Sequence, residues 1–410
     1  MERNIPVSRA RELILAGAWE LPVEKLAIAA ARGRVLAEDV RADRDIPPLD
    51  NSAMDGYGLR AADVAAADRD NPVRLRVVAE IPAGSFYDGT VGPGEAVRIM
   101  TGAPIPAGVD AVIRREWVKE GGDHVVLARP VPLGNDLRYA GEDVAAGAVV
   151  LEAGQLVTPA VVGMLAAVGR PLVEVYAQPR VAVIATGDEI VDFPENPGRG
   201  MLRNSNSYSL AALVEHAGGM PLRVPLVRDD PAKLRRVVEQ AAATCDLVLT
   251  TGGVSMGDYD FVKQVLGEVA GGIIFWQVKM KPGKPLVYGR VGETPLVGLP
   301  GNPVSVMVSF EQFVRPLLRK MSGRPASRWF LPRRTVTAGE DLPGAGERCH
   351  FLRGILREDE ADGPRVFLTG PQGSGILNSM VRGNCLVVLG PGEEARKGEP
   401  VTVEILDYGW

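Results

Sequence analysis

The central part of the chain alternates short apolar runs with helix-like segments. Five apolar runs have the length and composition of strands, at 181–186, 221–227, 246–251, 273–280 and 294–300. Each run ends in a loop of glycine, proline, carboxylate or lysine residues, and a helical pattern follows. This alternation is typical of a parallel α/β sheet. We therefore predict an α/β domain from about residue 179 to about residue 323.

The flanking segments have different patterns. Residues 7–20 and 23–32 have helical periodicity, and 139–178 returns to helix with an apolar segment around 159–168. Between them, short alternating strands punctuated by turn residues predict a small β domain, and the chain from 324 onward is all-β in pattern, a small barrel or sandwich.

We predict four domains from these changes of pattern. A discontinuous first domain covers 1–50 and 139–178, an inserted β domain covers 51–138, the α/β domain covers 179–323, and a β domain covers 324–410. Pro316, late in the last helix of the α/β domain, predicts a kink or an early end there.

The strand-end loops carry the candidate chemistry. Ligands of an open parallel sheet bind at the carboxyl ends of its strands, so the five loops should converge on one site. Gly252 and Gly253 allow close backbone approach to a phosphate group, while Lys281 and Lys284 flank a Pro-Gly pair and could hold an oxyanion. The loops also supply an excess of carboxylates, for which Mg²⁺ is the natural counterpart: Asp188, Glu189, Asp229, Asp230, Asp258 and Asp260.

Several of these residues also have an ordinary structural interpretation. Asp230 before Pro231 is typical of a helix N-cap, and Asn302 before Pro303 fits a cap as well as a ligand contact. A glycine pair after a strand is a common turn, and Thr101-Gly102 is equally consistent with a simple turn. Convergence of all the loops on one edge is therefore the stronger signal.

Composition narrows the function classes. A net charge of −5 argues against a general nucleic-acid or membrane surface binder, so an anionic substrate would need a local cationic site. The N-terminal segment lacks a cleavage pattern, and the apolar stretch 156–176 is interrupted by proline, glycine and charged residues. Three scattered cysteines and three histidines do not suggest a disulfide framework or a zinc site, and a reducing cytoplasm fits best.

Five motifs in the α/β segment, taken together, resemble one known family. ATGDEI, RNSNSYSL, TTGGVSMGDYDFVK, KMKPGKPLVYG and GLPGNPVS are similar to the molybdopterin molybdenumtransferase family, MoeA in bacteria and the E domain of gephyrin. DNSAMDGY, RIMTGAPIPAGVDAV, GED at 141–143 and GSGILNSM extend the resemblance over nearly the whole chain. The departures are Thr251 for serine, Met256 for valine and Gly383 for alanine, and none removes a charge.

The resemblance implies a fold and an activity. The fold is α/β multidomain, with a molybdopterin-binding-like parallel α/β domain, a discontinuous helical domain, an inserted small β domain and a C-terminal β-barrel-like domain. The activity is insertion of molybdate into adenylated molybdopterin with Mg²⁺-dependent release of AMP. The family also implies a homodimer with the site shared between protomers, and a partnership with the molybdopterin-adenylating enzyme remains open.

The resemblance also assigns the candidate residues. The catalytic residues would be Asp55, Asp143, Glu189 and Asp260. The metal ligands would be Glu189, Asp229 and Asp260. The substrate-binding residues would be Thr101, Gly252, Gly253, Ser255, Lys279, Lys281, Lys284, Pro300, Arg353 and Ser374. The segment Gly373-Ser374-Gly375 is also consistent with ordinary helix capping.

Two other functions stay open at this point. A scaffold like the receptor-anchoring gephyrin E domain is one, although no second fused domain is present in this sequence. An adenylyltransferase that activates molybdopterin is the other, because the central domain alone resembles such enzymes. The chain has no G-x-x-x-x-G-K-[ST] loop, which weakens an ATPase interpretation. The sequence does not discriminate molybdate from tungstate.

Overall fold

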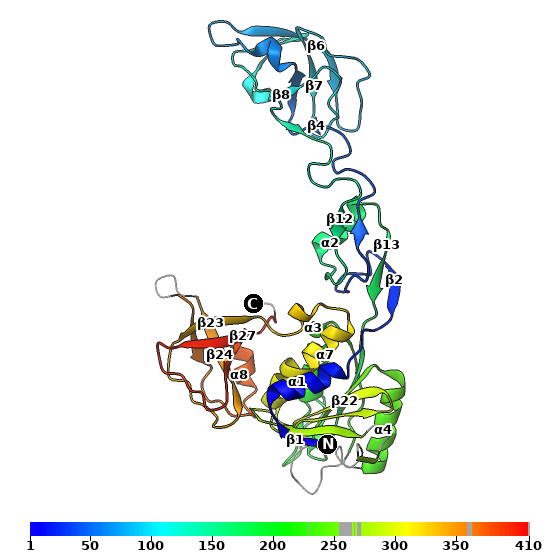
Figure 1. The fold of residues 1–410 in the computed structure, drawn as a ribbon, viewed down its shortest axis with the longest axis vertical. Helices are drawn as coiled ribbons and strands as arrows, with labels where there is room; N and C mark the ends of the chain where they lie inside the picture. Colours follow the sequence, from blue (N-terminus) through cyan, green and yellow to red (C-terminus); the bar gives the residue numbers. More distant parts are fainter. Residues whose placement is uncertain (229, 254–264, 266, 269–271, 359–362, 409–410) are drawn as a thin grey trace. The chain divides into compact units, whose positions relative to one another are not determined.

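The protein divides into two compact units, which we describe separately. A computed structural model describes residues 1–228, 230–253, 265, 267–268, 272–358 and 363–408. The first unit comprises Met1–Glu38, Gly154–Thr158 and Leu172–Trp410, and the second comprises Asp39–Ala153 and Pro159–Pro171. Figure 1 labels the helices and strands of both.

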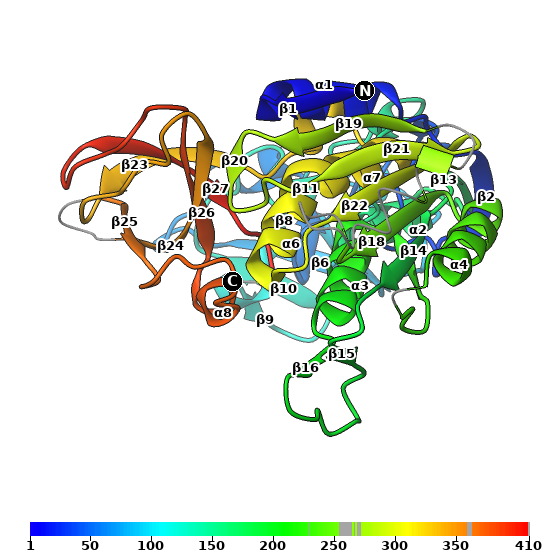
Figure 2. The ribbon, with the colours of Figure 1, turned by 90° about the horizontal axis from the view of Figure 1, so that it is seen from below.

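The first unit is built on a seven-stranded sheet, whose strand order from β1 to β14 can be followed in Figure 2. In spatial order the strands are β1 (Glu2–Ile5), β19 (Ile273–Val278), β21 (Val287–Val291), β22 (Thr294–Leu299), β18 (Leu247–Thr251), β14 (Arg180–Ala185) and β17 (Met220–Arg223). All five predicted strands are present and run in the same direction. β14, β17, β18 and β22 pair in parallel, and β19 has the same direction because it and β22 are both antiparallel to β21. The loops that follow these strands therefore lie along one edge.

Two strands of this sheet were not predicted. β21 is antiparallel to both β19 and β22, so the sheet is mixed and not purely parallel. β1 comes from the start of the chain and pairs in parallel with β19. Both depend on tertiary pairing, because the local pattern of a short segment does not specify its partner strand.

Helices cover both faces of the sheet. α1 (Val7–Ala16), α3 (Asn206–Ala217), α6 (Pro303–Ser309) and α7 (Arg315–Met321) contribute to the larger core, together with Phe275 and Leu299 of the strands. α4 (Pro231–Thr244) packs on a second core with Ile184 and Val248. The helix does not end at Pro316, because α7 continues to Met321. A π-helical segment at Phe310–Val314 separates α6 from α7 just before the proline, and a kink at Pro316 stays a prediction.

The predicted helix over 23–32 is wrong. Residues Val23–Ala27 form β2, which pairs antiparallel with β13 (Leu172–Tyr176). Backbone pairing with a distant segment satisfies the hydrogen bonds that a helix would have made internally. The return to helix predicted over 139–178 is confirmed only at α2 (Pro159–Ala167), in the second unit, and is wrong at Val149–Leu151 and Leu172–Tyr176, which are strands. The four-domain boundaries stay a prediction.

The second unit contains a six-stranded sheet and two small strand pairs. Its sheet follows the order β8 (Ala111–Arg114), β5 (Gly56–Leu59), β7 (Glu95–Ile99), β6 (Val73–Ile81), β10 (His124–Leu127) and β9 (Lys119–Glu120). The small pairs are β4 (Asn51–Ser52) with β11 (Leu137–Arg138), and β3 (Val40–Arg41) with β12 (Val149–Leu151). The short alternating strands predicted here are confirmed, and β5 and β9 are additional.

The C-terminal part of the first unit is a closed five-stranded barrel. Its strands are β23 (Arg333–Ala338), β24 (Cys349–Arg357), β25 (Arg365–Leu368), β26 (Cys385–Leu389) and β27 (Pro400–Ile405), and pairing of β24 with β26 completes the closure. The short strand β20 (Met280–Lys281) pairs with β24. A short helix, α8 (Asn378–Arg382), precedes β26.

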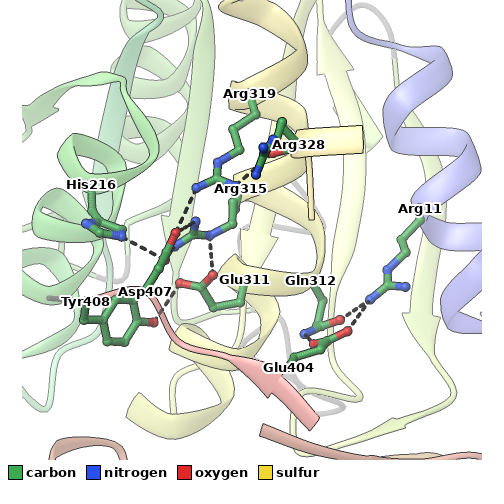
Figure 3. A network of polar contacts seen from close by, with 10 residues as sticks. All are labelled: Arg11, His216, Glu311, Gln312, Arg315, Arg319, Arg328, Glu404, Asp407 and Tyr408. Atoms are coloured by element: carbon green, nitrogen blue, oxygen red, sulfur yellow. Dashed lines mark hydrogen bonds and ion pairs between the residues drawn. The ribbon is translucent and has the colours of Figure 1, made fainter. Parts of the chain in front are cut away.

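A charged network joins the end of the barrel to the helices of the α/β part (Figure 3). Arg315, fully buried, donates to Glu311 and to Asp407, and Tyr408 Oη donates to Glu311 Oε1 at 2.7 Å. Burial by itself would raise the pKa of Asp407, but hydrogen bonds from His216 and Arg315 hold that pKa far below its ordinary value. The network fixes the segment after β27 against α3 and α7.

Two further observations complete the fold. All three cysteines, Cys245, Cys349 and Cys385, are free thiols. Across the described residues, every helix is too short or too polar to cross a bilayer.

Candidate functional site

A cavity of about 390 Å³ lies at the carboxyl ends of β14, β18 and β22, and we call it the strand-end cavity. Its lining comes from the loops after these strands, from the start of α3 and from the segment before α8. The lining residues include Thr186, Glu189, Arg203, Asn206, Thr251, Gly252, Gly301, Asn302, Gly375 and Leu377. Three of the five predicted loops therefore converge at one edge of the sheet.

Gly252 is required where β18 approaches β14. Its φ is +94°, and a Cβ at this position would lie 2.6 Å from the carbonyl oxygen of Thr186. A side chain would therefore meet backbone, which cannot move without displacing the strand. The positive φ predicted for the glycine pair is confirmed, while close approach of this backbone to a phosphate group stays a prediction.

Hydrogen bonds tie the cavity loops together. Asn206 Nδ2 donates to Thr251 Oγ1 at 3.0 Å and to the Gly301 carbonyl at 2.7 Å. Thr251 Oγ1 in turn donates to the carbonyl of Pro300, which is buried, at 3.0 Å. The start of α3 is thereby fixed to the loops after β18 and β22.

The carboxylates fall into two groups. Glu189 lines the strand-end cavity, and its carboxylate folds back to within 2.5 Å of where a Cβ on Gly187 would lie. Asp230 is a helix cap, as its side chain accepts from Lys233 N at 3.1 Å and Pro231 follows. The predicted residues Asp229, Ser255, Asp258 and Asp260 lie outside the described residues.

The structure does not place the three predicted lysines at this cavity. Lys279, Lys281 and Lys284 follow β19, and the described residues lining the strand-end cavity include none of them. Lys281 lies in β20 opposite His350 of the barrel, and Lys279 lines a different cavity of about 790 Å³ with Ser8 and Glu347. The antiparallel strand β21 separates β19 from β22 in the sheet, which distances their loops.

The segment before α8 contacts the cavity loops directly. Asn302 Nδ2 donates to Ser374 Oγ at 3.0 Å, and the Ser374 carbonyl accepts from Val304 N at 3.1 Å. Asn302 makes no side-chain cap bond to α6, so its amide serves this contact instead. Ser374 is thus held at the edge of the cavity.

Arg353 supports this segment from within the barrel. It is fully buried, and its guanidinium donates to Ser379 Oγ at 3.1 Å and to the Gly373 carbonyl at 3.3 Å. Burial lowers the pKa of Arg353 to about 10. These contacts position the loop that carries Ser374, while direct binding of substrate by Arg353 stays a prediction.

Asp55 and Thr101 lie together in the second unit. Asp55 Oδ1 accepts from Thr101 N at 2.7 Å and from Thr101 Oγ1 at 2.8 Å. The backbone bond, followed by the hydroxyl bond, lowers the pKa of Asp55 below its ordinary value. Both residues line a cavity of about 290 Å³ with Arg114 and Trp117. Asp143 is exposed and is not among the residues lining this cavity.

Sequence reasoning missed several cavity residues. Arg203, Asn204 and Asn206 belong to RNSNSYSL, which contributed to the resemblance without being assigned a role. A run of Asn and Ser before a helical pattern predicts capping, and Asn204 Oδ1 does accept from Ser207 N at 3.2 Å. The contacts of Asn206 with β18 and β22 loops have no sequence signal, because they depend on strand order.

Three family models cover most of the chain. Residues 5–169 match the MoeA N-terminal region (domain I and II), residues 182–320 match a probable molybdopterin binding domain, and residues 335–406 match the MoeA C-terminal region (domain IV). The strand-end cavity lies within the second and third of these matches, and Asp55 and Thr101 lie within the first.

Individual proteins agree with the family models. The chain is 42% identical over 363 residues to a Mycobacterium tuberculosis protein named molybdopterin molybdenumtransferase 2, covering 87% of this chain and 88% of that one. It is 40% identical over 370 residues to the Nostoc sp. molybdopterin molybdenumtransferase, covering 89% and 84%.

A solved structure matches over the whole length. The crystal structure of the molybdopterin biosynthesis moeA protein from Pyrococcus horikoshii is 34% identical, with a TM-score of 0.83 over 98% of this chain and 100% of that one. With three family models in order and relatives matched nearly end to end, the chain belongs to the MoeA family of molybdopterin molybdenumtransferases.

Proposed function

We propose that this protein inserts molybdenum into molybdopterin, with molybdate and adenylated molybdopterin as substrates and AMP as a product. The observation that carries the proposal is the strand-end cavity, which lies at the carboxyl edge of a sheet that matches a probable molybdopterin binding domain. The enzyme class follows from the relatives, which are named molybdopterin molybdenumtransferase.

The cavity suits the phosphate-bearing part of such a substrate. α3 runs for 12 residues from Asn206. Asn206 lines the cavity, so the amino end of this helix, which carries partial positive charge, lies at the cavity. Gly252 permits close approach of the backbone beside it. The backbone at this end of the cavity thus favours an anion, in a protein whose net charge is −5.

The magnesium part of the proposal rests on fewer residues. Among the described residues, no group of three or more His, Cys, Asp or Glu side chains is arranged to hold a metal ion. Glu189 is the carboxylate that the described cavity presents, and its proposed partners Asp229 and Asp260 lie outside the described residues. The described residues therefore do not form a complete metal site, and we assign no step to the ion.

We propose that Asp55 and Thr101 act on the same reaction from a partner protomer of a homodimer. Their paired geometry lowers the pKa of Asp55, so its carboxylate stays ionised in a cavity and can accept a hydrogen bond from a bound substrate. Asp143 would join them, while Lys279, Lys281 and Lys284 would attract molybdate. A partnership with the adenylating enzyme and a cytoplasmic location belong to the same proposal.

The test is turnover with the proposed substrates. Purified protein is incubated with adenylated molybdopterin and molybdate, and AMP and cofactor are measured; both should form without consumption of ATP. Glu189→Gln and Asp55→Asn should fold normally and lower conversion at least about tenfold. ATP consumption would favour an adenylyltransferase, and absence of turnover would favour a scaffold. Wild-type rates in both variants would remove the assignment of these carboxylates.

A further inference from the structure

The strand-end cavity has an uneven distribution of charge. Of the described residues that line it, Glu189 and Arg203 carry the formal charges, one of each sign. An anionic substrate in this cavity meets one carboxylate, which repels it, and one guanidinium. The three lysines expected to supply positive charge are not among the lining residues. Arg203 is therefore the cation that the described cavity offers.

The backbone around Arg203 is fixed on both sides. β16 (Leu202–Arg203) pairs in parallel with β15 (Ile190–Val191), at the base of a loop that extends beyond the start of α3 (Figure 2). Leu202 N donates to the Glu189 carbonyl at 2.8 Å, and Asn204 N donates to the Val191 carbonyl at 2.8 Å. Arg203 thus sits between two hydrogen-bonded neighbours.

Tyr208 of α3 contacts the start of the loop between β15 and β16. Its hydroxyl donates to Asp192 Oδ1 at 2.7 Å, and its ring packs edge-on against Phe193 with centroids 5.0 Å apart. The Arg223 guanidinium lies over the Tyr208 ring, with its Cζ 3.9 Å from the ring centroid. These contacts follow directly after β15, so the strand that pairs with Arg203 is held to the body of the domain.

The guanidinium of Arg203 itself has no neutralising partner among the described residues. Its side chain donates to Asn196 Oδ1, a neutral amide, at 3.5 Å, the long limit of a hydrogen bond. Neighbouring arginines are engaged differently: Arg223 stacks on Tyr208, and Arg228 Nη1 donates to the Asp188 carbonyl at 3.2 Å. A guanidinium is planar and always charged, and at the edge of a cavity its N–H groups are suited to bidentate contact with phosphate oxygens.

We propose that Arg203 binds the phosphate of the nucleotide-bearing pterin in the strand-end cavity. This inference rests on the proposed function and names a residue that contacts substrate. Glu189 also lines the cavity, so Arg203 is the described lining residue toward which an anionic group is attracted. Arg203 contributes to binding and does not transfer a proton.

The experiment measures AMP binding by isothermal titration calorimetry for wild type, Arg203→Gln, Arg203→Lys and Arg199→Gln. Arg199 is an exposed arginine of the same loop that does not line the cavity, which makes it a matched control. Arg203→Gln should weaken AMP binding at least about tenfold, and Arg199→Gln should bind AMP as wild type does. The affinity of Arg203→Lys for AMP should lie between those of wild type and Arg203→Gln. Thermal melts should be the same in all four.

Two readouts separate ligand binding from a merely structural role. The affinity of wild type should fall as salt is raised, and the dependence should be shallower in Arg203→Gln because one ionic contact is gone. In turnover assays Arg203→Gln should raise KM for adenylated molybdopterin with kcat nearly unchanged.

Different results overturn the two proposals. If Arg203→Gln binds AMP within about twofold of wild type while wild type releases AMP in turnover, the role of Arg203 is wrong and the proposed function stands. If wild type neither binds AMP nor forms cofactor, the proposed function fails, and the inference fails with it. An equal loss of affinity in Arg199→Gln would also contradict a specific role for Arg203.

Discussion

At the scale of single residues, the cavity depends on places where an ordinary side chain cannot fit. Gly252 combines a positive φ with a backbone carbonyl 2.6 Å from its would-be Cβ. Thr251, beside it, bridges Asn206 and the Pro300 carbonyl through one hydroxyl. Gly252 and Thr251 therefore hold the loops around the cavity at a fixed spacing.

Gly252→Ala should lower both stability and AMP binding. The added methyl group meets the Thr186 carbonyl and forces a strained φ, which should cost about 1–3 kcal/mol of unfolding free energy. Denaturant unfolding and calorimetric titration measure the two effects. Gly163→Ala, inside α2 with nothing within 4 Å of its would-be Cβ, is the opposite control and should stabilise by up to about 1 kcal/mol. Unchanged stability in Gly252→Ala would refute the steric requirement.

Thr101→Val should raise the pKa of Asp55. The variant loses the hydroxyl bond and keeps the backbone bond, so the pKa should move toward the ordinary 3.8 and remain below it. A lowered pKa keeps the carboxylate ionised until the solution is more acid; the acid limb of any activity that needs ionised Asp55 should therefore begin at higher pH in Thr101→Val. Carboxyl NMR titration of Asp55 measures the shift. Thr101→Ser retains the hydroxyl and should behave like wild type.

At the scale of elements, one interrupted helix organises the first unit. The π-helical segment Phe310–Val314 places Glu311 and Gln312 toward the barrel, where Gln312 Nε2 donates to Glu404 Oε2 at 2.7 Å. Arg315 follows in α7 and reaches Asp407 (Figure 3). The same element therefore joins the sheet, α3 and the end of β27, and it fixes the barrel that carries Ser374.

Arg315→Met should strongly destabilise the first unit. Arg315 and Glu311 are both essentially fully buried, so removing the guanidinium leaves a carboxyl without its ionic partner and should cost about 3–5 kcal/mol. Burial already raises the pKa of Glu311, and the loss of Arg315 should raise it further. Denaturant unfolding measures the loss.

The matched control removes both charges of this pair. Glu311→Leu/Arg315→Met should recover a large part of the stability, because a buried apolar pair has no desolvation penalty. A single-variant loss below about 1 kcal/mol, or a double variant no better than the single, would show that the network is not a stabilising element.

At the scale of the whole molecule, the predicted residues are divided between the two compact units. Asp55, Thr101 and Asp143 belong to the second unit, and Glu189, Gly252 and Ser374 belong to the first. Our proposal that one site draws on two protomers of a homodimer makes a quantitative prediction about mixed dimers.

Asp55→Asn and Glu189→Gln proteins should each have at most about a tenth of wild-type turnover alone and regain activity when mixed. In a mixed dimer one of the two sites would combine the intact Asp55 of one protomer with the intact Glu189 of the other. If protomers exchange at random, about half the dimers are mixed, so the mixture should reach about a quarter of wild-type turnover. Sedimentation analysis checks the dimer. No recovery after verified exchange would place both carboxylates in one protomer.

Much of the architecture could be predicted because strands and loops leave local patterns. The five strands, the cap at Asp230 and most strands of the two β regions follow from periodicity and turn residues. The segment 23–27 could not, since its five residues form a strand only by pairing with β13. The site prediction was incomplete in the same way, because Arg203 and Asn206 reach the cavity through pairings that no local pattern encodes.

By itself, the sequence determined that polar and glycine-rich loops follow apolar strands, and its motifs indicated the family. Those features depend on neighbours within a few residues, which is the range of backbone propensity and side-chain periodicity. Only the tertiary structure decided which loops meet. Because β21 lies between β19 and β22, the segment with Lys281 is separated from the loop with Gly252. Parallel pairing of β15 with β16 brings Arg203 to the cavity. Strand order and register arise from packing of the whole sheet, and packing is not a local property of the chain.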